Sequence, residues 1–281
     1  MEIPKFPLAE TLERAISWVH LNVDSPFRVI GAVILGLESS LRTLLLVVPP
    51  LVLIGAMAVL VYRLAGRRPA LLSAVGLLVI WDLRLWQAAM ETLSLVVVAS
   101  ALSLLIGIPA GVLVAESRTA RAVAAPILDY MQSTPSFVYL IPNVLFFGLG
   151  TVPGVLSTVM FALPPPVRIT ALGIQLVDRE VIEAGEAFGC SRWQLLRKIK
   201  LPLAVPSILL GINQCILMAL SLVVIASLIG ARGLGTKVIE AITRVEISAG
   251  VEAGVAVVIL AMVLDRMSRG VVRERPGRGW L

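Results

Sequence analysis

The chain has 281 residues, of which 58% are hydrophobic and only 15% are charged, and its mean hydropathy is +0.95. Soluble domains carry about 25% charged residues. These values exclude a soluble globular protein and predict an all-α polytopic membrane protein. The chain holds one histidine and two cysteines, Cys190 and Cys215, which are too few and too far apart for a disulfide framework or a zinc site.

The first 86 residues predict an interfacial segment and two accessory helices. Residues 1–42 are mixed and charged, and apolar positions after Pro26 predict a helix that lies in the membrane interface or packs on the spans. Residues 43–62 form the first uncharged run, about 30 Å of helix, which Pro49 and Pro50 should kink. Residues 70–81 predict a second, shorter span.

The long apolar runs after residue 86 predict five more spans, and therefore about seven transmembrane helices in all. The uncharged run 130–167 would measure about 57 Å as one helix, nearly twice the hydrocarbon thickness, so it must fold back. The turn-rich stretch 148–154 is the expected break. The five spans expected are 92–115, 136–149, 154–172, 201–231 and 248–267.

The distribution of basic residues predicts the orientation. Of the 24 Lys and Arg residues, 16 lie in the segments 63–68, 116–121, 168–200 and 266–281, which the spans place on one side. Basic loops stay in the cytoplasm. The C-terminus and the loop 168–200 should therefore be cytoplasmic and the N-terminus outside, and the positive charge indicates topology, not nucleic-acid binding.

The largest cytoplasmic loop predicts two short helices. Asp178 can cap a helix over 179–188, and Gly189 can end it in the left-handed conformation. Ser191 and Gln194 have the spacing of a capping box for a second helix, and Pro202 opens the next span. A soluble partner could push or pull a helix held in this way beneath the membrane.

This loop resembles the EAA loop of ABC-importer permeases. The sequence Glu183-Ala184-Gly185, then Gly189, and after nine residues Ile199-Lys200-Leu201-Pro202, follows the pattern EAA, three residues, G, nine residues, I-x-L-P. Gly185 departs from it, because the family has a second alanine there. The resemblance implies that Glu183, Ala184, Gly185 and Gly189 dock in a cleft on an ATPase, and that Ile199, Leu201 and Pro202 fix the docking helix to its span.

A second group of stretches resembles the permeases of glycine betaine/proline uptake systems. The stretches are 131–142, 147–150, 161–165, 225–231, 233–235 and 259–266, so the resemblance covers about residues 87–270. It implies a type I, MetI-like ABC permease core at 87–270 with the coupling loop at 175–202. Residues 43–86 are then accessory helices, and 271–281 form a basic cytoplasmic tail.

The resemblance also implies the partners. These are a second copy of the permease, which makes a homodimer, two cytosolic ATPase subunits that bind ATP and magnesium, and an extracytoplasmic substrate-binding protein. No cofactor is expected on this chain, and its expected location is the bacterial inner membrane. ATP-driven closure of the ATPase pair would move the docking helices and switch the pathway between outward and inward access.

Polar and aromatic residues within the spans are candidates for the translocation pathway. Polar side chains in hydrocarbon are costly and should face protein or water, where they make interhelical hydrogen bonds or line the pathway. A quaternary ammonium group has no N–H, so a site for it would use aromatic faces; aromatics at this spacing also pack in cores. The candidates are Gln132, Ser136, Phe137, Tyr139, Asn143, Asn213 and Ser221, with Gln214, Phe146 and Phe147.

Other functions have weaker support in the sequence. The chain lacks the HExxH and GxSxG motifs of an intramembrane enzyme. The stretch 230–237 is close to a phosphate-binding loop but places Thr236 before Lys237 and follows no strand, so it is interpreted as a flexible outer loop. A channel or secondary transporter, or a permease for choline, carnitine or taurine, stays an alternative.

Overall fold

The computed structural model describes residues 24–273, and every regular element in that part of the chain is a helix. The elements are α2 (Asp24–Val47), α3 (Pro50–Ala65), α4 (Arg67–Asp82), α5 (Trp86–Glu116), α6 (Arg118–Ser133), η1 (Ser136–Tyr139), α7 (Leu140–Phe147), α8 (Thr151–Ala162), α9 (Pro164–Gln175), α10 (Arg179–Ala187), α11 (Arg192–Leu195), η2 (Leu196–Lys200), α12 (Leu201–Ala226), η3 (Ser227–Ile229), α13 (Leu234–Arg244) and α14 (Ile247–Arg273).

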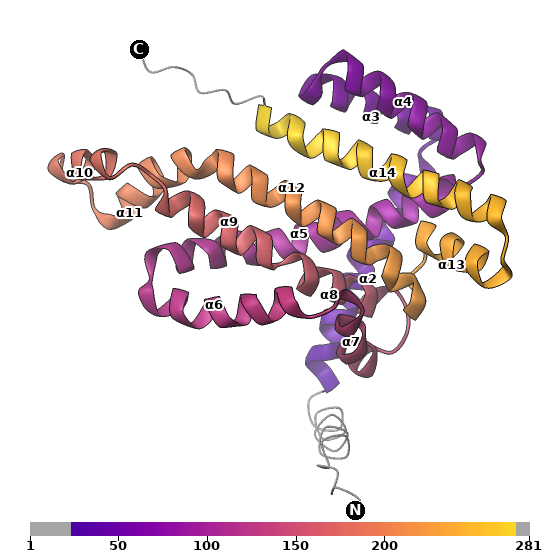
Figure 1. The fold of residues 1–281 in the computed structure, drawn as a ribbon, viewed down its shortest axis with the longest axis horizontal. Coiled ribbons are helices and arrows are strands. Elements are labelled where there is room, and N and C mark those ends of the chain that lie inside the picture. The colour runs from indigo at the N-terminus through magenta and orange to yellow at the C-terminus, as the bar shows by residue number, and fades with distance from the viewer. Residues whose placement is uncertain (1–23, 274–281) are drawn as a thin grey trace, which may run out of the picture.

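Five helical stretches of the described chain are long and apolar enough to cross a membrane. They are Ser25–Val47, Trp86–Glu116, Thr151–Gln175, Arg192–Ile229 and Ile247–Gly270. The last four match the expected spans 92–115, 154–172, 201–231 and 248–267, except that the third of these stretches ends two residues early. Five stretches of sufficient length are fewer than the seven spans expected. In Figure 1, α5, α9 and α12 run lengthwise beside one another, with α10 beyond one end and α13 near the other.

The core forms around α5, whose side chains are almost all buried from Trp86 to Ser100. Further along α5, glycines allow α9 to approach closely. A Cβ at Gly107 would lie 2.8 Å from Pro166, and one at Gly111 would lie 2.7 Å from Cβ of Thr170. Small residues four positions apart bring helix backbones together in membranes. Gly107 and Gly111 therefore form the contact surface at which α5 and α9 pack closely.

The expected single helix over residues 43–62 is wrong. α2 ends at Val47 and α3 begins at Pro50, so the chain breaks where a kink was expected. Neither Pro49 nor Pro50 can donate a backbone hydrogen bond, and Pro49 has an extended conformation (ψ 136°), which stops the helix. α3 and α4, of 16 residues each, then form a hairpin that packs on α14.

α2 crosses the direction of α5, α9 and α12 instead of running along it (Figure 1). Near its start, the ring of Phe27 stacks on Phe146 with centroids 5.1 Å apart. Further along, the Glu38 carboxylate accepts a hydrogen bond of 2.9 Å from Ser94 near the start of α5. Of the two alternatives for the N-terminal helix, packing on the other helices is therefore observed. Residues 1–23 of that segment and 274–281 of the basic tail lie outside the described residues.

The expected span over 136–149 is also wrong, because this stretch holds only the short helices η1 and α7. Eight residues of α7 make about 12 Å of helix, which cannot cross a bilayer. α6 precedes them and lies beside α9, and the chain is extended at Thr134 and Pro135 between α6 and η1. The sequence 118–147 is therefore one broken helix.

The turn between α7 and α8 lies where the sequence predicted it. Gly148 and Gly150 have positive φ angles of 72° and 128°, which favour glycine. The Gly150 N–H donates to the Ile229 carbonyl at 2.8 Å, which holds this turn against the end of α12.

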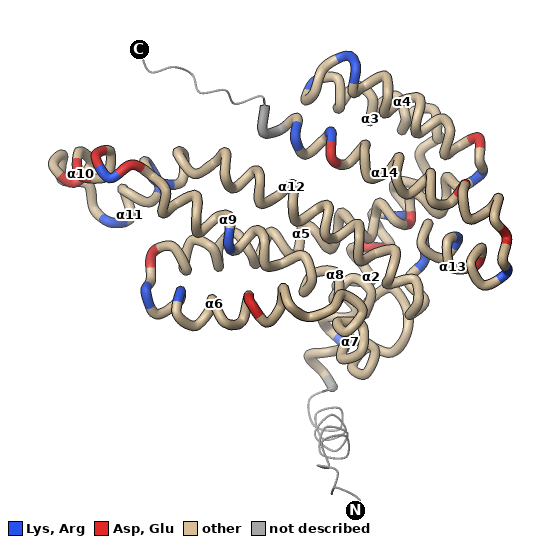
Figure 2. Tube along the Cα trace, in the orientation of Figure 1, with Lys and Arg blue, Asp and Glu red and all other residues tan. Residues whose placement is uncertain are grey.

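The loop after η3 packs against the start of α5. The Leu234 N–H donates to Thr92 Oγ1 at 2.8 Å, and Ala231, Gly233 and Leu234 are buried. The interpretation of 230–237 as a flexible loop is therefore wrong for this buried part. On α13 that follows, a hydrogen bond from Lys237 lowers the pKa of the exposed Glu240. Figure 2 shows most charged residues near the ends of the long helices and few along their middles.

Candidate functional site

The predicted coupling helix is present as α10. It spans Arg179–Ala187, and Gly189 after it has a φ of +78°. The backbone N–H groups of Gly189 and Cys190 donate to the carbonyls of Glu186 and Gly185, which closes the helix end. This left-handed ending is one that glycine adopts at little cost. The short helix and its glycine end confirm the local structure expected from the sequence.

The start of α10 differs from the expectation. Asp178 occupies the N-cap position, but its side chain makes no capping hydrogen bond. Arg179 in the first turn instead pairs with Glu183, with Nε and Oε1 2.8 Å apart, and both side chains are exposed. An exposed pair of this spacing adds little stability. The carboxylate of Glu183 therefore stays at the surface, where a partner can reach it.

The second helix of the loop begins with the predicted capping box. Ser191 Oγ accepts from the Gln194 N–H at 3.3 Å, and Gln194 Oε1 accepts from the Ser191 N–H at 2.8 Å. α11 then passes through η2, a π-helical turn, directly into α12. Such turns inside helices are frequent at functional sites. Because no loop intervenes, a displacement of α11 is transmitted to α12.

The packing of α10 against α11 and η2 explains why residue 185 is a glycine. It is buried, and a Cβ at this position would lie 2.6 Å from Cδ1 of Ile199 and 2.7 Å from Cδ2 of Leu195. The residue that departs from the motif is therefore required by close packing within the loop. It lets α10 lie closer to the side chain of Ile199, which is one of the residues expected to fix it.

An ion pair that was not predicted joins the loop to α5. Lys200 Nζ lies 2.7 Å from Glu116 Oε1, and both side chains are largely shielded from solvent. Lys200 precedes α12 and Glu116 ends α5, so the pair connects the starting point of one long helix to the end of another. The sequence did contain a signal for this pair. Glu116 follows the uncharged run 92–115, Lys200 precedes the uncharged run 201–231, and the predicted topology places both residues at the same membrane face.

The outer surface of the loop carries large apolar side chains that nothing covers in the described chain. Phe188 is 90% exposed and Trp193 is 65% exposed, and they flank the glycine end of α10. Monomeric surfaces seldom expose aromatic side chains in such a group without a binding role. With the Glu183 carboxylate they define the docking surface, the exposed area around the end of α10 where the sequence predicts that a partner binds.

Three pathway candidates gather at the break between α6 and η1. Gln132 is exposed, Ser136 is half-buried and Phe137 is 58% exposed, and η1 contacts α12. Non-helical backbone at membrane depth is tolerated where it is buried in protein or lines a polar cavity. The break therefore leaves Gln132 and Phe137 exposed at an interruption between two helices.

Tyr139 and Asn143 point into the protein. Tyr139 is buried, its hydroxyl donates to the Met131 carbonyl, and its ring packs edge-on against Phe161. The Asn143 side-chain amide donates to the Tyr139 carbonyl at 2.8 Å and to Ser157 Oγ at 3.0 Å. Both residues bind the broken helix to α8, so interhelical hydrogen bonding accounts for them.

The remaining candidates divide into residues that pack inside the protein and residues that stay accessible. Asn213 accepts a hydrogen bond from Ser268, which joins α12 to α14. Ser221 is exposed and donates to the Leu217 carbonyl one turn earlier, and Gln214 is exposed on α12. Phe146 and Phe147 both pack against Phe27 of α2. Gln214 and Ser221 thus stay accessible, whereas Asn213 and the two phenylalanines have packing roles.

Two further charged contacts lie within apolar surroundings. Arg168 of α9 pairs with Asp129 of α6 at 2.5 Å, close to the break, and Glu38 is buried against Ser94 with Arg42 3.9 Å away. In the sequence, the sign of these contacts was a charged residue inside an apolar stretch, which usually needs a partner. Within residues 24–273, no group of three or more His, Cys, Asp and Glu side chains is placed to hold a metal ion.

The comparisons with known proteins agree with this geometry. Residues 107–274 match the family of binding-protein-dependent transport system inner membrane components. The glycine betaine transport system permease protein OpuAB of Bacillus subtilis is 40% identical over 99% of this chain and 98% of its own length. The glycine betaine/carnitine transport permease protein GbuB of Listeria monocytogenes is 42% identical over 95% of this chain and 96% of its own.

A solved structure shares the fold. A chain of the MetNI methionine ABC transporter, in an inward-facing conformation, superposes with a TM-score of 0.63 at 23% identity and covers 69% of this chain and 97% of its own. At this identity the likeness shows the fold alone. It supports the MetI-like fold that the resemblance to glycine betaine/proline permeases implied.

Sequence, fold and the coupling loop therefore lead to one assignment. The chain belongs to the family of binding-protein-dependent transport system inner membrane components and is a multi-pass permease subunit of the ABC type.

Proposed function

We propose that this chain is the membrane subunit of an ATP-driven importer for glycine betaine, proline or a related quaternary ammonium solute. The support is the set of relatives that it matches over nearly the full length of both chains, which are named as glycine betaine permeases. A third, the ProW permease of Escherichia coli, is named for glycine betaine and proline betaine and is 40% identical over 97% of this chain and 77% of its own.

The observation that carries the mechanism is the rigid connection of α10 to the membrane helices. α10 packs through Gly185 on Leu195 and Ile199, and η2 continues into α12. The Lys200 to Glu116 ion pair extends this connection to α5. A partner ATPase that holds Glu183, Phe188 and Gly189 and moves on binding ATP would therefore tilt α12 and α5 together.

The break at Thr134 and Pro135 is the proposed point of contact with the substrate. Phe137 offers an exposed aromatic face to a quaternary ammonium group, and Gln132 and Ser136 offer hydrogen bonds to a carboxylate. The neighbouring α12 presents Gln214 and Ser221. A second copy of the chain, placed against this surface, would enclose a pathway between the two subunits.

The proposed topology has seven crossings, with α2 lying across the outer ends of the helices. α3, α4, α5, the broken helix 118–147, the joined α8 and α9, α12 and α14 each cross once. The N-terminus is then outside, and the α7–α8 turn and α13 face a substrate-binding protein. Two ATPase subunits, which bind ATP and magnesium, contact the α10 helices of the permease pair at the inner face.

The test uses the complex of permease, ATPase and binding protein in vesicles. Glu183→Lys and Gly189→Asp should abolish most substrate-stimulated ATP hydrolysis and uptake, because both change the docking surface. Glu186→Lys is the matched control, since Glu186 is exposed on the same helix outside the motif. Unchanged uptake in both variants, in complexes that assemble normally, would remove the docking role.

The same vesicles separate the alternatives. A channel or secondary transporter would continue to take up solute when the ATPase cannot hydrolyse ATP, whereas the proposed importer stops. Competition of labelled glycine betaine uptake by proline, choline, carnitine and taurine ranks the substrates. Glycine betaine or proline betaine should compete most strongly.

A further inference from the structure

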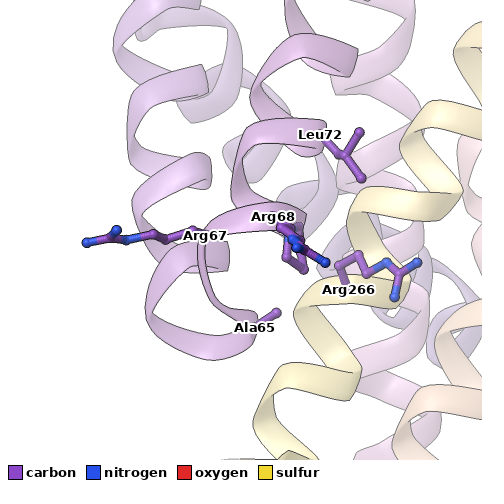
Figure 3. Close-up of a pocket in the computed structure, with 6 residues that line it drawn as sticks. Ala65, Arg67, Arg68, Leu72 and Arg266 are labelled. Atoms are coloured by element: carbon purple, nitrogen blue, oxygen red, sulfur yellow. The ribbon is translucent and has the colours of Figure 1, made fainter.

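A pocket at the tip of the α3–α4 hairpin is lined by three arginines from two helices. Arg67 and Arg68 begin α4, Arg266 lies near the end of α14, and Ala65, Pro69 and Leu72 complete the lining around about 420 Å³. Figure 3 shows the Arg68 and Arg266 side chains next to each other, with Arg67 extending to the other side of the hairpin. None of the lining residues is acidic.

The three guanidinium groups have no anionic partner among the described residues. Asp265, the acid next to Arg266 in the sequence, pairs with Arg269 instead, with Nε and Oδ1 2.7 Å apart. The start of α4 adds to the positive potential: Gly66 provides no side-chain cap, and the first turn contains no acid. Free N–H groups at a helix start favour a bound anion. Two neighbouring guanidinium groups also repel each other unless an anion lies between them.

The pocket is preformed. A Cβ at Gly270 of α14 would lie 2.5 Å from Cβ of Leu64, so the end of α3 sits directly on the backbone of α14. This contact fixes the α3–α4 turn relative to Arg266 without any ligand. The helix segments that carry the arginines therefore need little reorganisation to bind an anion.

One side of the pocket continues into an apolar surface on α4. Leu72 lines the pocket and is 69% exposed, and Leu71 and Val75 are also exposed on the same helix. In a membrane-spanning hairpin these side chains face lipid tails. A ligand that fits both parts has a phosphate group beside the arginines and acyl chains along α4.

We propose that this pocket binds the headgroup of an anionic phospholipid. The phosphate lies between Arg68 and Arg266 at the start of α4, and an acyl chain follows Leu72. The site lies outside the coupling loop and the pathway, so it anchors the accessory hairpin and α14 to the inner leaflet.

The test measures lipid retention by native mass spectrometry on the purified complex, with phosphatidylglycerol, phosphatidylcholine and glycerol phosphate as probes. The wild type should retain phosphatidylglycerol in preference to phosphatidylcholine. Arg68→Gln/Arg266→Gln should bind phosphatidylglycerol about tenfold or more weakly, as expected for two basic side chains near an anionic headgroup. Arg63→Gln/Arg118→Gln removes the same charge from arginines that do not line the pocket and should bind as the wild type does.

Equal loss in the two double variants would overturn the proposal, because general surface charge would then explain retention. Glycerol phosphate binding as strongly as phosphatidylglycerol would overturn the lipid assignment in favour of a soluble phosphate. If Arg68→Gln/Arg266→Gln does not assemble, Arg266→Gln alone should still weaken retention several-fold, and unchanged retention there would also contradict the site. The measurement needs no transport, so it is independent of the proposed function.

Discussion

Gly189 ends α10 with a φ of +78°, and a Cβ at this position would meet no atom within 4 Å, so the site requires its conformation and not its small size. Alanine there should cost about 1 kcal/mol or more from backbone strain. Gly189→Ala should therefore lower substrate-stimulated ATP hydrolysis several-fold in the assembled complex. Gly55→Ala in α3, which also meets no atom within 4 Å but has no positive φ, should leave it near the wild-type rate.

The Lys200 to Glu116 pair can be tested by exchanging its charges. Lys200→Glu and Glu116→Lys each place like charges together and should reduce uptake more than they reduce basal ATP hydrolysis. The double exchange should restore part of the loss, with a coupling energy of about 1 kcal/mol. The measurement is uptake per ATP hydrolysed. If the losses of the two single variants simply add in the double variant, the ion pair does not transmit movement between the helices.

At the residue scale, motif spacing predicted the local structure of the coupling loop well. Gly189 and the Ser191 to Gln194 capping box depend on neighbours within a few positions, so the sequence specifies them directly. The Lys200 to Glu116 contact and the reason for Gly185 depend on residues brought together by tertiary packing. Spacing along the chain carries no information on such contacts.

At the scale of elements, the break at Pro135 is the feature whose removal is most informative. Pro135→Ala restores a backbone donor and lets helix continue from α6 into η1. Uptake should fall at least tenfold while the complex still assembles, because the side chains of Gln132 and Phe137 would be reoriented. Pro126→Ala, in the interior of α6, is the control and should have a smaller effect. Normal uptake by Pro135→Ala would contradict a pathway role for the break.

Hydropathy located the long helices but not their interruptions. The cores of α5 and α12 contain uncharged runs of span length, and α14 contains an apolar run interrupted only by Glu252 before Asp265, so their existence followed from the sequence. α6 was missed because Arg118, Arg121 and Asp129 interrupt its apolar pattern, and its partner η1 with α7 was mistaken for a whole span. Pro49 and Pro50 were expected to bend a helix, whereas two successive residues without N–H groups end it.

At the scale of the whole molecule, the proposed topology predicts which residues reach each side of the membrane. In a background with Cys190 and Cys215 replaced by serine, Glu186→Cys and Arg67→Cys should react with a membrane-impermeant thiol reagent only after the membrane is opened. Glu246→Cys, in the turn between α13 and α14, should react in intact cells. Labelling of position 67 in intact cells would contradict the orientation of the α3–α4 hairpin.

The central claim is that the chain relays movement from a partner ATPase to the membrane helices. The direct measurement is the distance between spin labels at position 186, the exposed control position on α10, of the two permease copies, in vesicles that also contain the ATPase and the binding protein. The distance should change by several ångströms when a non-hydrolysable ATP analogue is added, and Gly189→Asp should abolish the change. An unchanged distance in complexes that transport normally would contradict the account.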